Sequence, residues 1–368
     1  MQLEKYPFVR LDEWRTDARA RGIDVIDFGV GDPREITPAF IREALKDAIE
    51  ERSSYPRAAG LPELRSAIAT WIARRYGAGV DADVEIVPTL GSKEAIFSFA
   101  QVALGERRLV AIPELAYPVY ERGAVAAGAS VVSVPMREET GWLPDLDAID
   151  AWDEIALLWV CYPNNPTGAT APLSFYEELA GLAREHGFLV CSDEAYSELW
   201  FDEPPASMLQ VADREHVVVF NTLSKRSSMT GYRSGFVCAP AQVADALRAF
   251  RPSVGTAPQE FVQRASIAAW SDEEHVSAVR DVYRRKRDTL LPVLERKGLR
   301  SAGGNATFFL WLAVDGPSEA FAQSLLEHGI LVAPGSFFGA AGEGYVRLAL
   351  VPTEEDCERA AAILERVL

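Results

Sequence analysis

The sequence is poor in the residues that build disulfide frameworks and metal sites. Its 368 residues include only four cysteines, four histidines and four methionines. The cysteines lie far apart and show no paired spacing, so neither a disulfide framework nor a metal site is indicated. Three of them lie in apolar, strand-like runs, and we expect buried, reduced thiols at Cys161, Cys191, Cys238 and Cys357.

Long apolar runs and clusters of basic residues are also absent. No stretch approaches the ~20 apolar residues that a membrane-spanning helix needs, and residues 1–15 do not resemble a signal peptide. Acidic side chains outnumber basic ones by 54 to 37, and no run of Lys and Arg could follow a phosphate backbone. We therefore expect a soluble, cytoplasmic protein that binds neither a membrane nor nucleic acid.

Short apolar runs alternate with amphipathic helical patterns from about residue 38 to residue 250. This alternation predicts an α/β fold, with a mostly parallel sheet that is flanked by helices. Seven runs are predicted to be strands: Glu85–Val87, Leu109–Ile112, Val131–Val134, Ala156–Cys161, Phe188–Ser192, Val217–Asn221 and Gly235–Cys238. Ligands bind such sheets at the carboxyl ends of the strands, where the unusual motifs of this chain occur.

The stretch Arg251–Pro258, which contains Pro, Ser and Gly, is typical of a domain boundary. Helical and strand-like patterns beyond it predict a smaller α+β domain. We therefore expect three parts: an N-terminal arm that packs with the small domain (1–37), a large domain (38–257) and a small C-terminal domain (258–368).

The stretch 217–237, VVVFNTLSKRSSMTGYRSGFV, places Lys225 in a polar turn directly after an apolar strand. Cationic and apolar surroundings lower the pKa of a lysine held in this way, so that it can act as a nucleophile and a base. The nearby hydroxyl groups and Arg233 suit a phosphate group. For a Ser-Lys pair taken alone, a solvated turn lysine is the alternative.

The order TLSKxxxxxGxRxG resembles the cofactor-lysine signature of class I/II aminotransferases, which have the fold of aspartate aminotransferase (fold type I) and depend on pyridoxal phosphate. The resemblance implies that Lys225 binds pyridoxal 5'-phosphate as a Schiff base and moves the substrate proton. It also implies that Thr222, in place of the more usual serine, and Arg233 hold the cofactor phosphate.

Two further motifs follow predicted strands. SDEAYSEL, at 192–199, contains Asp193, which in the family keeps the pyridine nitrogen protonated, and Tyr196, which donates to the phenolate oxygen. An aspartate at this place could also cap a helix. YPNNPTG, at 162–168, forces a sharp turn, and the family pattern implies that Asn165 reaches the phenolate oxygen and the substrate. For Asn164, a structural Asx turn is the alternative.

Two other motifs hold candidate cofactor contacts. LGSKEAIF, at 90–97, places Ser92 and Lys93 at the start of a helix, where N–H groups and the helix dipole suit a phosphate, although capping alone would explain this pattern. PELAYPVY, at 113–120, contains Tyr117, which by the resemblance stacks on the pyridine ring. Ordinary packing is the alternative for an isolated tyrosine.

Three more positions complete the set that the resemblance implies. Arg347, in YVRLAL, binds the substrate carboxylate bidentately, unless it is an outward-facing edge residue. Gly31, in FGVGDP, belongs to a segment that closes over the substrate. Tyr55 matches a tyrosine that reaches the phosphate of the neighbouring subunit, which implies a homodimer with shared active sites.

The resemblance extends over nearly the whole chain, and it implies amino-group transfer between an amino acid and a 2-oxo acid, with glutamate and 2-oxoglutarate as the usual pair. SKEAI, AYPVYERGAVAAGA and ILVAPGSFFG are most similar to segments of N-succinyldiaminopimelate aminotransferases of bacterial lysine biosynthesis. Enzymes specific for LL-diaminopimelate, broad aspartate or aromatic aminotransferases, and C–S lyases of the same fold are the alternatives. Arg57 is a candidate for binding the distal carboxylate, or else a solvated loop residue.

Overall fold

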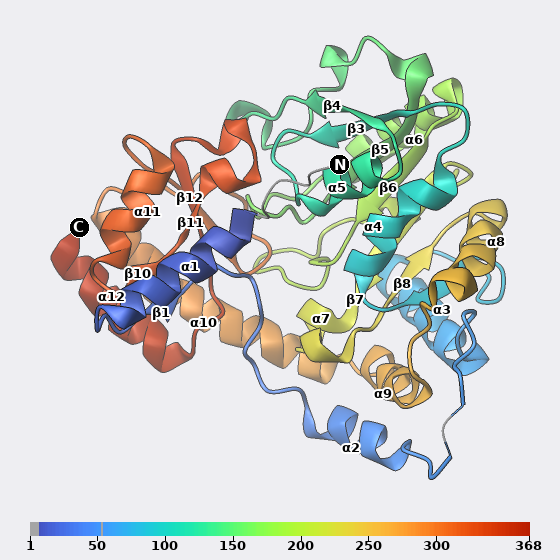
Figure 1. The fold of residues 1–368 in the computed structure, drawn as a ribbon, viewed down its shortest axis with the longest axis horizontal. Coiled ribbons are helices and arrows are strands. Elements are labelled where there is room, and N and C mark those ends of the chain that lie inside the picture. The colour runs from blue at the N-terminus through green and yellow to red at the C-terminus, as the bar shows by residue number, and fades with distance from the viewer. Residues whose placement is uncertain (1–6, 53) are drawn as a thin grey trace.

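The computed structural model describes residues 7–52 and 54–368, which form a large and a small part connected through a long helix, α10 (Glu274–Arg296). Figure 1 shows the sheet and its covering helices on one side and the smaller part, with both α1 (Pro7–Ala20) and the C-terminal helix α12 (Glu354–Val367), on the other.

A seven-stranded sheet forms the centre of the large part, in the order β2-β8-β7-β6-β5-β3-β4. Strand β8 runs antiparallel to both of its neighbours, and all other neighbouring pairs are parallel. The strands are β2 (Ile86–Thr89), β3 (Leu109–Pro113), β4 (Ser130–Val134), β5 (Ile155–Cys161), β6 (Leu189–Asp193), β7 (Val217–Thr222) and β8 (Gly235–Cys238). The seven strands predicted from the sequence are thus confirmed, with small shifts at their ends.

Each face of the sheet packs against its own helices because side chains alternate along the strands. On β5, Leu157 and Trp159 belong to the core beneath one set of helices, whereas Leu158 and Val160 belong to the core on the opposite face. The first set is α4 (Ser92–Ala103), α5 (Val119–Ala126) and α8 (Ala241–Phe250); the second includes α3 (Pro62–Tyr76) and α6 (Leu173–His186). Each fully buried side chain of this size stabilises the fold by about 1.5–3 kcal/mol.

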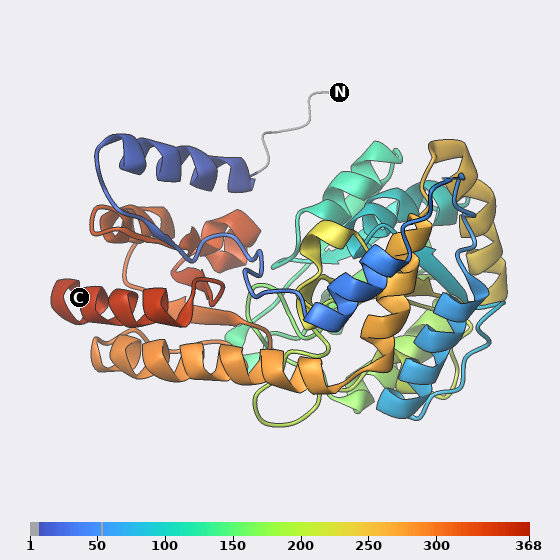
Figure 2. The ribbon, with the colours of Figure 1, turned by 90° about the horizontal axis from the view of Figure 1, so that it is seen from below.

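Two small sheets organise the remainder. Strands β11 (Ala333–Pro334), β12 (Tyr345–Ala349) and β9 (Phe309–Ala313) form an antiparallel sheet. The N-terminal strand β1 (Ile26–Asp27) pairs in parallel with β10 (Ile330–Leu331), so residues near the N-terminus lie on the small part. Figure 2 shows α1 passing over this part, beside α11 (Ser318–Leu326).

Helix α9 (Glu260–Ser271) lies beyond the predicted boundary at residue 257, yet it packs against α3 and α2 (Ala39–Asp47) of the large part. Its buried Trp270 contacts Trp71 of α3, with ring centroids 4.6 Å apart. This packing favours a boundary at the start of α10 rather than at residue 257. The division into three parts stays a prediction, and the packing of α9 disagrees only with the boundary at residue 257.

All four cysteines are buried and free, as the sequence predicted. Burial raises the thiol pKa at each of them, which keeps the sulfur protonated and unreactive. None of the helices in the described residues is both long enough and apolar enough to cross a membrane.

Candidate active site

The carboxyl ends of the parallel strands meet at one edge of the sheet and open into a cavity of about 330 Å³. Its wall is completed by the small part and by the segment after β1. Eleven residues singled out from the sequence line it: Gly31, Ser92, Lys93, Tyr117, Asn165, Asp193, Tyr196, Thr222, Lys225, Arg233 and Arg347.

Lys225 lies in α7 (Leu223–Arg226), a single helical turn that begins where β7 ends. The hydroxyl of Thr222 caps this turn by accepting a hydrogen bond from Ser224 N–H, 3.1 Å away. The Lys225 amine donates to the carbonyl oxygen of Gly31 at 2.8 Å. Burial lowers the pKa of Lys225 to about 8; Arg347 and Arg233 also lower it, whereas Asp32 opposes the shift. The neutral, nucleophilic amine is therefore accessible near neutral pH.

Asp193 ends β6 and is buried, and Tyr120 donates a hydrogen bond to it at 2.7 Å. Burial raises the pKa of its carboxyl to about 6, while the bonds from Tyr120 and the Ala195 N–H act in the opposite direction. The Tyr120 ring stacks on Trp159 at 4.7 Å, which holds the donor in place. We did not single out Tyr120 from the sequence, although it lies in the same motif as Tyr117, three residues further on.

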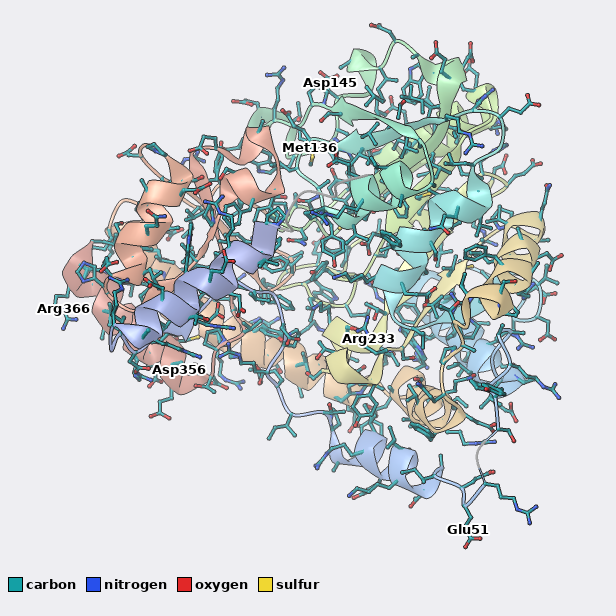
Figure 3. All side chains as sticks on the ribbon, viewed as in Figure 1. Glu51, Met136, Asp145, Arg233, Asp356 and Arg366 are labelled. Carbon is teal, nitrogen blue, oxygen red and sulfur yellow. The ribbon has the colours of Figure 1, made fainter. Side chains whose placement is uncertain are left out.

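A cationic corner forms where β2 leads into α4. Ser92 and Lys93 open α4, and Arg233 faces them; its Nη2 donates to the carbonyl of Leu90 at 3.2 Å. Gly91 has φ +74°, and a Cβ there would lie 2.6 Å from Arg233 Nη2, so glycine leaves room for the guanidinium. Figure 3 labels Arg233 beside the ribbon of α7. Helix-end N–H groups and two cations together suit a phosphate.

Arg347 projects from β12 into the cavity and is almost completely buried. It donates to Asn165 Oδ1 and to the carbonyl of Gly29, each at 2.7 Å. Its guanidinium lies between the rings of Phe309 and Phe338, at 4.2 and 4.6 Å from their centroids. The alternative of an outward-facing edge arginine is therefore excluded, and the guanidinium faces a cavity in which such a group can pair with an anion.

Other predicted positions differ in their surroundings. Tyr117 and Tyr196 both line the cavity, and Lys93 lies 5.9 Å from the Tyr117 ring. Asn164 makes the Asx-turn contacts of a structural residue, because its Oδ1 accepts from the N–H and the hydroxyl of Thr167. Tyr55 and Arg57 are exposed and do not line the cavity within this chain.

Phe8 and Asp32 also line the cavity and, like Tyr120, were not singled out from the sequence. Phe8 lies in α1, and its ring approaches that of Phe338 edge-on at 5.4 Å. Nothing in its sequence neighbourhood indicates this contact, which depends on how α1 packs on the small part. Asp32 follows Gly31 directly in FGVGDP, so proximity to that glycine was an available signal.

The cavity combines an amine of lowered pKa, a buried carboxylate, an aromatic ring and a cationic corner with a separate arginine. This set fits an enzyme that holds a phosphorylated aromatic aldehyde against a lysine while an arginine binds a carboxylate substrate. The close approach of the Arg233 guanidinium to the start of α4, which Gly91 allows, is consistent with a phosphate at that corner.

The chain belongs to the class I and II aminotransferases, whose family model matches residues 23–364. Curated relatives include LL-diaminopimelate aminotransferases of Aquifex aeolicus, 40% identical over 98% of this chain and 96% of the relative, and of Nitratidesulfovibrio vulgaris, 38% identical with the same coverage.

Solved structures from Thermus thermophilus agree with the fold. A probable N-succinyldiaminopimelate aminotransferase is 31% identical, with a TM-score of 0.91 over 98% of this chain and all of the other. An aspartate aminotransferase with maleate is 32% identical, with a TM-score of 0.91 over all of this chain and 97% of the other. The protein is therefore a pyridoxal-phosphate-dependent aminotransferase of the aspartate aminotransferase fold.

Proposed function

We propose that this aminotransferase takes LL-diaminopimelate as its amino donor and 2-oxoglutarate as its acceptor. The names of the relatives at 38–40% identity favour LL-diaminopimelate over its N-succinyl derivative, which the sequence motifs had suggested. The Thermus structure named for the N-succinyl substrate is less similar, at 31% identity.

The charge of the cavity wall is the observation that favours LL-diaminopimelate over its N-succinyl derivative. Among the described residues, two acidic side chains line the cavity. Asp193 is buried, whereas Asp32 is exposed. With Asp193 assigned to the cofactor ring, Asp32 is the acid that remains for the substrate. LL-diaminopimelate has a distal ammonium group that Asp32 can bind, whereas N-succinylation removes that positive charge.

The lining residues that the sequence predicted then each have a role. Ser92, Lys93, Thr222 and Arg233 hold the cofactor phosphate, Tyr117 stacks on the ring, and Asp193, supported by Tyr120, keeps the ring nitrogen protonated. Asn165 and Tyr196 contact the phenolate oxygen. Arg347 binds the substrate carboxylate, and Gly31 lies close enough to the Lys225 amine to limit where the substrate can lie.

Bound pyridoxal phosphate supplies an aldehyde and an electron-withdrawing ring. The protein positions the proton transfer: Arg347 orients the substrate so that its Cα–H bond faces Lys225, whose free Nζ removes the proton and returns it. The lowered amine pKa suits this role because a neutral Nζ is the proton acceptor.

The active site is completed by a second copy of the chain. Tyr55 is fully exposed in the monomer, and a partner copy would bring its hydroxyl to the phosphate corner. The exposed Phe97 of α4 lines an apolar cavity beside that corner, together with Lys93 and Arg233, which is where the partner would pack.

A panel of amino donors with 2-oxoglutarate tests the substrate. We expect kcat/KM for LL-diaminopimelate to exceed that for N-succinyl-LL-diaminopimelate, aspartate and phenylalanine by at least about tenfold. Asp32→Asn should lower kcat/KM for LL-diaminopimelate about tenfold and leave that for glutamate nearly unchanged. A preference for the N-succinyl substrate would refute the choice of substrate but not the reaction class.

Replacing Lys225 by Ala tests the site itself. The variant should lose amino transfer, the visible absorption of the lysine–cofactor linkage and the adduct that borohydride traps. Lys297→Ala, on the small part, is the matched control and should retain all three. A reducible adduct that persists in Lys225→Ala would show that another amine binds the cofactor. Incubation with cystathionine distinguishes a C–S lyase from an aminotransferase, because only the lyase would release pyruvate.

A further inference from the structure

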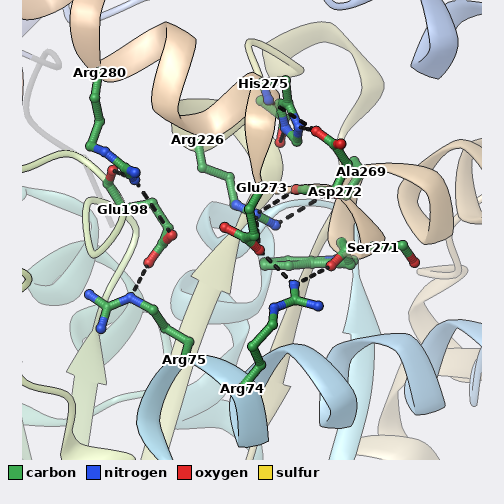
Figure 4. Close-up of polar contacts among 12 residues, drawn as sticks. Arg74, Arg75, Glu198, Arg226, Ala269, Ser271, Asp272, Glu273, His275 and Arg280 are labelled. Carbon is green, nitrogen blue, oxygen red and sulfur yellow. Dashed lines mark hydrogen bonds and ion pairs between the residues drawn. The ribbon is translucent and has the colours of Figure 1, made fainter.

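A chain of buried hydrogen bonds connects the segment after Lys225 to the junction between α9 and α10. Ser227 Oγ lies 2.9 Å from His275 Nε2, and His275 Nδ1 lies 2.6 Å from Asp272 Oδ1. The same carboxylate oxygen accepts from the His275 N–H at 3.0 Å. Ser227 is completely buried and His275 almost so. Figure 4 shows His275 and Asp272 directed toward each other.

The residue between Lys225 and Ser227 is anchored at the same junction. The buried Arg226 side chain lies 4.6 Å from the Trp270 ring centroid and 5.4 Å from that of Trp71. Its Nη2 donates to Glu273 at 3.0 Å and to the Asp272 carbonyl at 3.4 Å (Figure 4). Both residues that follow Lys225 are therefore bound to residues 270–275.

That junction is where the large part meets the small one. Helix α10 begins there and continues beside α12 into the small part, as Figure 2 shows. Along its length, the buried Lys286 forms an ion pair with Glu35. Glu35 lies four residues after Gly31, whose carbonyl accepts from the Lys225 amine. Helix α10 thus reaches the surroundings of Lys225 from two directions, through Ser227 and through Glu35.

We propose that Ser227, His275 and Asp272 are positioning residues that set the place of the Lys225 amine and connect it to the orientation of α10. In the neutral histidine, Nδ1–H donates a hydrogen bond to Asp272, and Nε2 is then free to accept a hydrogen bond from the Ser227 hydroxyl. Burial and the nearby Arg226 lower the pKa of His275, which favours this neutral form.

The arrangement of the three side chains matches that of a hydrolytic Ser–His–Asp triad, but its surroundings assign it to positioning. Ser227 is completely buried and does not line the active-site cavity, so no substrate carbonyl can reach its hydroxyl. The consequence for Lys225 follows from chain connectivity, since Ser227 lies two residues away on the turn that carries the amine.

The inference rests on the proposed role of Lys225, and Ser227→Ala tests it by removing a single oxygen atom. The readout is the pH midpoint of the visible band of the holoenzyme without substrate, followed by kcat and KM. We expect Ser227→Ala and His275→Ala to shift the midpoint by at least about half a pH unit. They should lower kcat about tenfold, with KM within about twofold. His275→Gln, which can still bond Ser227, should retain a midpoint closer to that of the unmodified protein.

Ser318→Ala is the matched control, because Ser318 is equally buried and bonds a carboxylate, Glu343, at 3.0 Å, but does not line the active-site cavity. It should lose thermal stability without a change in midpoint or kcat. If Ser227→Ala folds and behaves like Ser318→Ala, the three residues are merely structural and the proposal is overturned. This outcome differs from failure of the proposed function, in which Lys225→Ala would keep its visible band.

Discussion

Asp193 illustrates how burial and hydrogen bonding oppose each other at a single side chain. Removing water disfavours its charged form, and the Tyr120 hydroxyl recovers part of the cost by donating to the carboxylate. The site therefore holds a carboxylate that is poorly solvated and ready to pair with a cation. In the proposed function, the protonated pyridine nitrogen of the cofactor would supply that cation.

Replacing Tyr120 by Phe should weaken cofactor binding while preserving the ring stack on Trp159. The hydrogen bond from Tyr120 lowers the pKa of Asp193, so without it less of the carboxylate is charged near neutral pH and the cofactor Kd should rise about tenfold. Fluorescence titration of the apoprotein with pyridoxal phosphate measures this change. Tyr345→Phe is the control, because it removes a tyrosine hydroxyl of the small part that donates to Glu138. An unchanged Kd in Tyr120→Phe would contradict the role of Tyr120.

The raised pKa of Asp193 predicts how the stability of the apoprotein depends on pH. The sign is opposite to that expected for a salt-bridged carboxylate, whose pKa is lowered. The folded protein binds the Asp193 proton more tightly than the unfolded chain, so its contribution to stability is present at low pH and is lost as pH rises through about 6. The free energy of unfolding, relative to Asp193→Asn, should fall by about 2–3 kcal/mol between pH 4 and pH 7. Urea titrations of both apoproteins measure it, and a rise over that interval would be the contrary result.

Among the elements, the turn between β2 and α4 has a backbone conformation that requires glycine. Gly91 adopts a positive φ and leaves room for the guanidinium of Arg233, so the cationic corner depends on the absence of a side chain there. The corner also depends on β8, whose antiparallel pairing with β2 and β7 brings Gly235 next to both strands. A Cβ at Gly235 would lie 2.4 Å from the Asn221 carbonyl oxygen.

Gly91→Ala should therefore weaken phosphate binding more than it destabilises the fold. The guanidinium of Arg233 can move aside, but it then leaves the place where it would meet the phosphate. The backbone of Gly91, at φ +74° and ψ 171°, lies in a region that is essentially restricted to glycine, which adds strain of about 1–3 kcal/mol. We expect the Kd for pyridoxal phosphate to rise at least tenfold while the Kd for pyridoxal, which lacks the phosphate, changes by less than about threefold. Gly105→Ala, where a Cβ would meet no atom within 4 Å, is the control. An equal effect on both ligands would place the disturbance elsewhere.

Across the whole molecule, the exposed apolar side chains indicate how two copies would meet. Tyr55, Phe97 and Val254 are exposed, and Phe97 and Val254 line one apolar cavity next to the phosphate corner. In the proposed dimer, burial of this surface would remove apolar area from water and would bring Tyr55 of each copy to the cofactor site of the other. Assembly and cofactor binding should therefore be coupled.

A dimer with shared sites predicts that Phe97→Asp lowers both dimer stability and cofactor affinity. An uncompensated charge in the interface should shift the equilibrium toward monomers by at least about tenfold in Kd. Sedimentation velocity over a concentration series measures assembly, and absorbance in the same runs reports the bound cofactor. Val9→Asp, at an exposed apolar position on α1, is the control. A monomeric protein that retains full cofactor affinity would disprove the coupling.

The strands and the order of the motifs along the chain were predictable because they depend on local patterns. Apolar runs of the right length became β2–β8. The position of α9 was not predictable, because its amphipathic pattern indicates a buried face without identifying what covers it. Its packing on α2 and α3 depends on contacts between residues about 200 positions apart.

The local sequence was sufficient to indicate the lysine, the aspartate and the arginine of the site, since each follows or lies within a recognisable strand. The partners of these side chains were decided by the tertiary structure: Tyr120 beside Asp193, the two phenyl rings around Arg347, and His275 behind Ser227. Backbone conformation is set largely by neighbours in the chain. The solvation and charge of a side chain are set by whatever atoms the fold brings within a few ångströms of it, which no local pattern specifies.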